Sequence, residues 1–88
     1  MGLGTEEDLA SETEKWLKKA LLEVETVSPR GDEGERFLSN IRAYLSDCLY
    51  FSEKGDLIRA FEAVIWAWAW IEIGQQVGIL IAEEDRRA

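Results

Sequence analysis

The chain of 88 residues is long enough for one domain and too short for two. Its net charge of −8 leaves no basic surface for phosphates, so we expect no nucleic-acid partner and no anionic membrane. Histidine is absent, which removes the usual general base and the usual zinc ligand, and we expect no metal or other cofactor.

The first predicted helix covers about residues 5–26. Its apolar residues recur at helical spacing on one stripe: Leu9, Trp16, Leu17, Ala20, Leu21, Val24 and Val27. Pro29 disfavours helical geometry at the residue before it, so this helix is expected to end ahead of Pro29.

The second predicted helix covers about residues 33–54. Its apolar stripe comprises Phe37, Ile41, Tyr44, Leu45, Cys48 and Phe51. Lys54 and Gly55 form a stop signal, because glycine adopts the left-handed conformation that closes a helix. Asp56 follows at once and is suited to cap the next helix. The two helices on either side are therefore predicted to form a tight antiparallel hairpin.

The third predicted helix covers about residues 56–84 and would be the longest. Large and small residues alternate over residues 64–70, which is typical of a strand. Helical spacing also holds from Leu57 to Ile71, and a lone strand in a helical chain would have no pairing partner, so a helix is favoured. Gly74 and Gly78 leave open whether this helix bends or ends early.

These elements predict one all-α domain over residues 1–88, an antiparallel three-helix bundle with a long third helix. The longest unbroken apolar run, residues 63–71, is too short to cross a bilayer, and we expect no membrane span. The predicted core gathers the apolar stripes of the helices: Leu17, Leu21, Val24, Phe37, Ile41, Leu45, Cys48 and Phe61.

Short motifs follow one another from residue 43 to residue 72. They are Ala43-Tyr44, Asp47, Tyr50-Phe51, Lys54-Gly55-Asp56, Ala60-Phe61-Glu62-Ala63, Trp66-Ala67 and Ile71-Glu72. This run resembles the archaeal domain of unknown function family 357, although Trp66 stands where the family more often has tyrosine and Cys48 where it more often has alanine. The resemblance implies a three-helix bundle in a cytoplasmic archaeal protein, and it carries no activity.

Carboxylates are the remaining candidates for catalysis. Glu62 and Glu72 are about 15 Å apart along a helix, too far for one catalytic pair, and Arg59 is placed to form an ion pair with Glu62. Cys48 lies on an apolar stripe with no basic residue near it to stabilise a thiolate. We therefore expect no enzyme activity, and no catalytic, cofactor-binding or metal-binding residue.

The aromatic residues of the third helix point to a function. Two neighbouring helices cover only part of its circumference, so one aromatic face should stay exposed unless long neighbouring side chains cover it. The candidate interface comprises Trp66, Trp68, Trp70, Ile73 and Val77, with Trp68 as the first choice.

The sequence thus predicts a cytoplasmic, non-catalytic helical module for protein interaction or oligomerisation. It would form a homodimer or bind a protein partner through the third helix. The alternative is an accessory domain that binds a small ligand or a nucleotide for a separately encoded enzyme.

Overall fold

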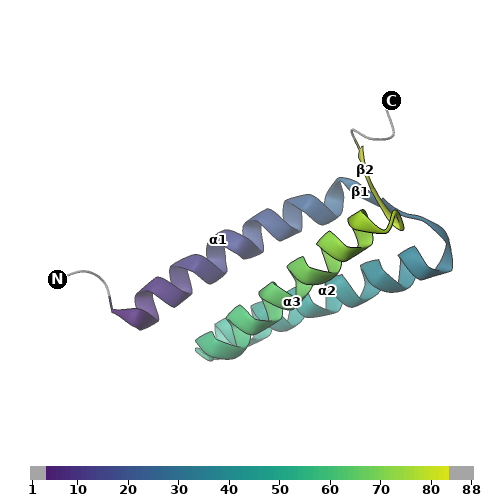
Figure 1. The fold of residues 1–88 in the computed structure, drawn as a ribbon. Coiled ribbons are helices and arrows are strands. Elements are labelled where there is room, and N and C mark those ends of the chain that lie inside the picture. The colour runs from purple at the N-terminus through teal and green to yellow at the C-terminus, as the bar shows by residue number, and fades with distance from the viewer. Residues whose placement is uncertain (1–3, 84–88) are drawn as a thin grey trace.

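The computed structural model describes residues 4–83 as three helices and one small antiparallel sheet (Figure 1). In chain order the elements are α1 (Thr5–Glu25), β1 (Val27–Pro29), α2 (Gly31–Glu53), α3 (Leu57–Gln76) and β2 (Leu80–Ala82). The packed helices confirm the predicted three-helix bundle. The two strands are absent from the sequence-based prediction, and they lie together at one end of the bundle.

The hairpin between α2 and α3 is formed as predicted. Gly55 has a φ of 78°, in the left-handed region, and its backbone N–H donates to the carbonyl of Ser52 over 3.1 Å. Asp56 caps α3, since its Oδ1 accepts a hydrogen bond from the backbone N–H of Arg59 over 3.2 Å. The Arg59 guanidinium also bonds Asp56 Oδ2 over 2.7 Å, and the side-chain and backbone bonds from Arg59 lower the pKa of the Asp56 carboxyl.

Helix α3 ends at Gln76, so the prediction of a long third helix reaching residue 84 is wrong. The reason is a left-handed turn at Gly78, whose φ is 83°. The N–H of Gly78 donates to the carbonyl of Gln75 and the N–H of Ile79 to that of Gly74, which is the Schellman pattern of a helix C-terminus. With 20 residues, α3 is shorter than α1 and α2.

Strand β1 lies in the predicted connection between the first two helices, and β2 lies in the segment that was predicted as the end of the third helix. Ser28 pairs with Ile81, and flanking backbone bonds join Arg30 N to Ile79 O and Glu83 N to Thr26 O. Leu80 is 1% exposed and packs on Gly74, where an added Cβ would come within 2.5 Å of the Leu80 side chain. The sheet therefore extends the helical core at one end of the bundle.

Helix α3 is the central helix of the fold. It contacts α2 most extensively and α1 next, whereas α1 and α2 contact each other little. Its buried side carries Ala60, Ala63 and Ala67, whose small side chains let the neighbouring helices approach closely.

The core confirms most of the predicted positions. Buried as expected are Leu17, Val24, Ile41, Leu45 and Cys48. Phe37 and Phe61 are half-buried at its edge. Leu21 is 40% exposed, because the sparse contact between α1 and α2 leaves it on an open hollow together with Leu45 and Leu49.

Replacing Gly55 with alanine tests the cap of α2. No atom lies within 4 Å of a Cβ added there, so backbone strain at positive φ is the expected effect. Gly55→Ala should lower the free energy of unfolding by about 1 kcal/mol in urea denaturation. Lys54→Ala, at the neighbouring exposed position, is the control and should change it little. Equal midpoints for Gly55→Ala and the wild type would contradict this account.

Replacing Gly34 with alanine tests the packing of α2 on the sheet end. Alanine normally stabilises a helix interior by about 1 kcal/mol over glycine. At Gly34, however, the new Cβ would lie 2.5 Å from the backbone oxygen of Ile79, which the sheet holds in place. Gly34→Ala should therefore lower the melting temperature, whereas Glu35→Ala at the next, exposed position should not. A more stable Gly34→Ala protein would show that this end of the bundle is loosely packed.

Candidate functional site

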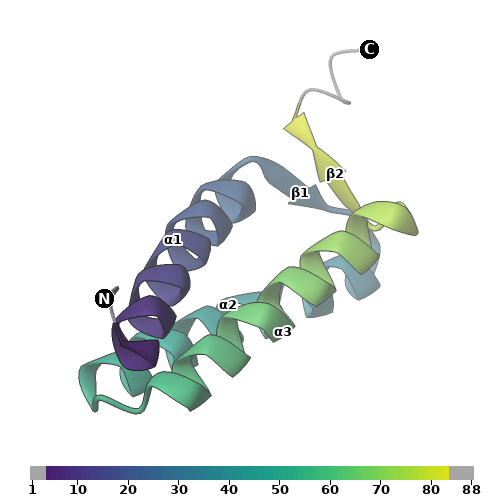
Figure 2. The same ribbon diagram turned by 60° about the vertical axis from the view of Figure 1, so that its left-hand side comes forward.

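The side of α3 that α1 and α2 do not bury carries a stripe of large apolar side chains. We call it the outer face of α3, and it comprises Ile58, Ile65, Trp66, Ile73 and Val77. The least exposed of them, Ile65 and Ile73, are each 45% exposed, and Ile58 is 73% exposed. Figure 2 shows α3 running along α2 with α1 to one side of that pair, so both neighbours leave part of α3 uncovered.

Three of the five predicted interface residues lie on this outer face. They are Trp66, Ile73 and Val77. The ring of Trp66 stacks on Tyr44 of α2 with a centroid separation of 6.4 Å, yet 52% of Trp66 stays exposed.

Trp68, the first choice for the interface, packs in the contact between α1 and α3 and is only half-buried there. Its ring meets Trp16 edge to face at 5.9 Å, and its Nε1–H donates to the backbone carbonyl of Trp16 over 3.0 Å. These two contacts hold the half-buried indole in one orientation.

Trp70 also packs inside the molecule. Its ring meets Phe37 of α2 edge to face at 4.7 Å. Its Nε1–H is buried and has no hydrogen-bond partner among the described residues.

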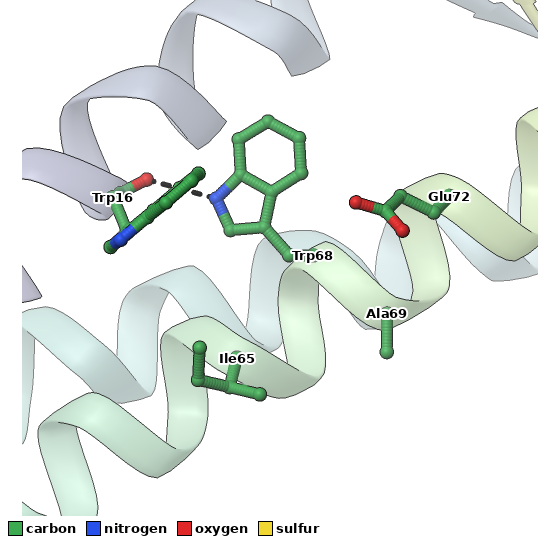
Figure 3. Close-up of a pocket in the computed structure, with 5 residues that line it drawn as sticks. All are labelled: Trp16, Ile65, Trp68, Ala69 and Glu72. Atoms are coloured by element: carbon green, nitrogen blue, oxygen red, sulfur yellow. Dashed lines mark hydrogen bonds between the residues drawn. The ribbon is translucent and has the colours of Figure 1, made fainter.

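Two shallow hollows lie along the outer face and share Ile65. The first, of about 330 Å³, is lined by Trp16, Ile65, Trp68, Ala69 and Glu72 (Figure 3). The second, of about 320 Å³, is lined by Ile58, Phe61, Glu62, Ile65 and Trp66. Each hollow therefore combines two aromatic rings, at least one isoleucine and one carboxylate.

The carboxylates of these hollows have no ion-pair partner within residues 4–83. Arg59, expected to pair with Glu62, bonds Asp56 instead, and Glu62 adds only a weaker attraction that helps to raise the pKa of Arg59. Glu72 is exposed at the rim of the first hollow, and Figure 3 shows its carboxylate directed toward the ring of Trp68.

Comparison with known proteins places the chain in a family. The sequence model of DUF357, described as a protein of unknown function, matches residues 11–80. The chain belongs to the DUF357 family. The crystal structure of protein AF1782 from Archaeoglobus fulgidus, a member of DUF357, is similar to this chain at 54% identity and a TM-score of 0.81, over 90% of this chain and 99% of that one. No curated protein matches the chain.

The resemblance inferred from residues 43–72 is thereby confirmed, and the DUF357 match extends it into α1 and β2. Within the described part of this DUF357 domain, no helix is long and apolar enough to span a bilayer.

Acidic and cysteine side chains are the possible metal ligands in the described part of the domain. No three acidic or cysteine side chains gather there as a metal site would require. Cys48 is buried, and burial raises the pKa of its thiol, which keeps it protonated and unreactive.

The sequence analysis missed Ile58 and Ile65. Ile58 and Ile65 are seven residues apart, as are Trp66 and Ile73, and together they form two parallel rows on one helix surface. The seven-residue spacing is present in the sequence, but the prediction of the interface was based on the alternating tryptophans.

Paired tryptophan variants test the contact between α1 and α3. Trp68→Phe and Trp70→Phe delete the same atoms, but only Trp68 loses a hydrogen bond. Trp68→Phe should therefore lower the free energy of unfolding by about 1 kcal/mol more than Trp70→Phe does. Urea denaturation measures the difference, and equal losses would show that the bond to the Trp16 carbonyl contributes nothing.

Proposed function

We propose that this DUF357 domain is a non-catalytic protein-interaction module that binds another protein chain through the outer face of α3. The observation that carries the proposal is the stripe of exposed side chains, of which Ile58, Trp66 and Val77 are each more than half exposed. Large apolar side chains gathered on one surface mark interaction sites in soluble proteins, and tryptophan is enriched at such interfaces.

The chemistry of the chain supports a non-catalytic role. A chain without histidine lacks the side chain that most often transfers protons near neutral pH. Glu62 and Glu72 lie in separate hollows, and the Cys48 thiol is buried. The cytoplasmic location expected from the sequence stays a prediction.

The alternative function, binding of a small ligand or a nucleotide, finds less support in the hollows. The first hollow has room for a small ligand, but no basic side chain lines it. A nucleotide phosphate would meet Glu72 there, and like charges repel.

A matched pair of double variants tests the proposed function. Trp66→Ser with Ile73→Ser removes two apolar side chains from the outer face of α3. Leu22→Ser with Leu49→Ser removes two exposed apolar side chains from α1 and α2. Both proteins should stay folded, because substitutions at exposed positions usually change stability by about 0.5 kcal/mol or less.

The outer-face variant should lose the association that the wild type shows, and the control should keep it. The measurements are sedimentation velocity up to about 100 µM, a generous concentration for a weak dimer, and co-purification from native cells. A wild type that stays monomeric, together with co-purifying proteins that the outer-face variant retains, would contradict the proposal. A melting temperature that rises with added nucleotide or lipid in both variants would favour the alternative.

A further inference from the structure

The outer face of α3 carries two carboxylates among its apolar side chains. Glu62 and Glu72 are exposed, and each lines one of the hollows that share Ile65. Ten residues separate them, which is about 15 Å or nearly three turns along the helix.

The nearby basic side chains already have partners. Arg59 bonds Asp56 over 2.7 Å, and Lys15 bonds Glu12 over 3.1 Å. The ammonium of Lys19 lies over the ring of Trp16, 4.7 Å from its centroid. The two glutamates are therefore left without an ion-pair partner among residues 4–83, beside the apolar side chains of the outer face.

This charge pattern opposes the packing of a second copy of the chain on the same face. If two α3 helices pack antiparallel about the middle of the face, Glu62 of one copy lies opposite Glu72 of the other. If they pack parallel and in register, each glutamate lies opposite its own equivalent. Both arrangements bring like charges together in an interface, which disfavours association.

We propose that the outer face of α3 binds a basic amphipathic helix of another protein. The helix would carry an apolar stripe flanked by two lysine or arginine side chains about three turns apart. This inference rests on the proposed function and specifies the chemistry of its partner.

The apolar rows of the outer face suit a helix as the bound element. Ile58 and Ile65 form one row and Trp66 and Ile73 the other, each with the seven-residue spacing of helix–helix seams. Ala69 lies between them, and its small side chain permits close approach of a second helix. Helical partners of this kind bind through anchors at three-, four- and seven-residue steps.

The two hollows suit basic side chains as the flanking groups. In the first, a cation beside the Glu72 carboxylate would also meet the indole of Trp68, and tryptophan is the best aromatic partner for a cation. The hydrogen bond to the Trp16 carbonyl already fixes that indole, so little of its freedom is lost on binding. In the second hollow, Glu62 is one of the lining residues together with the aromatic side chains of Phe61 and Trp66.

Two synthetic helical peptides of about 20 residues test this inference. They share an apolar leucine stripe and differ at two flanking positions three turns apart, which hold lysine in one peptide and glutamate in the other. Titration at low salt, followed by tryptophan fluorescence and calorimetry, should show at least about tenfold tighter binding of the lysine peptide. Added salt should weaken that binding, because screening reduces the attraction between exposed charges.

Charge reversal on the domain provides the matched control. Glu62→Lys with Glu72→Lys should invert the preference, so that the glutamate peptide binds more tightly. Asp47→Lys with Glu53→Lys makes the same change in net charge at exposed positions of α2, and should leave the preference for the lysine peptide in place. Circular dichroism of both variants checks that they remain folded.

Equal binding of the two peptides, or no binding of either, would overturn the inference. Its failure is distinguishable from failure of the proposed function. If the wild type self-associates and Trp66→Ser with Ile73→Ser abolishes this, the outer face binds a second copy and only the basic partner is wrong. If the outer-face variant changes neither self-association nor peptide binding, both proposals are wrong.

Discussion

The three-residue connection between α2 and α3 determines which side of α3 is buried. Gly55 reverses the chain and Asp56 starts the next helix, so α3 has to lie antiparallel along α2 from its first turn. Once that direction is set, the helical repeat places Ala60, Ala63 and Ala67 against the neighbouring helices. The same repeat places Ile58, Ile65 and Ile73 on the opposite side. The exposed apolar face is thus a consequence of the hairpin.

The small sheet fixes the other end of the bundle. Helix α1 leads into β1 and α3 into β2, so their pairing joins the ends of two helices that are far apart in sequence. Gly34 and Gly74 leave room for this sheet to lie directly on α2 and α3, and Leu80 fills the remaining space. The hairpin and the sheet hold α3 at both ends, which gives its outer face a defined surface.

Elements that a few adjacent residues encode were predicted correctly, whereas elements that depend on residues far apart in the sequence were not. Lys54-Gly55-Asp56 is a complete stop-and-start signal within three residues, and the structure follows it. The strands have three residues each, too few to show a period, and their pairing joins Ser28 to Ile81 across most of the chain. Gly78 ends α3, but the apolar residues around it are also compatible with a helix that continues.

The candidate site was predicted only in part for a related reason. Periodicity shows that Trp66 and Trp68 point in nearly opposite directions, but it does not show which of the two directions α1 occupies. The ring of Trp16 in α1 packs on Trp68, whereas the ring of Trp66 stacks on Tyr44 of α2 and stays 52% exposed.

Stability of the isolated domain does not account for the outer face of α3. Burial of apolar area stabilises a fold by about 25 cal/mol per Å², and side chains that stay in water contribute little of this. Helix α3 already packs in the core through its alanine-lined side, where Val64 and Ile71 are fully buried. Polar residues at Ile58, Ile65 and Ile73 would serve the isolated fold as well and would improve its solubility. The apolar rows, and the two carboxylates that line hollows together with aromatic rings, therefore support the proposal that this surface meets another chain.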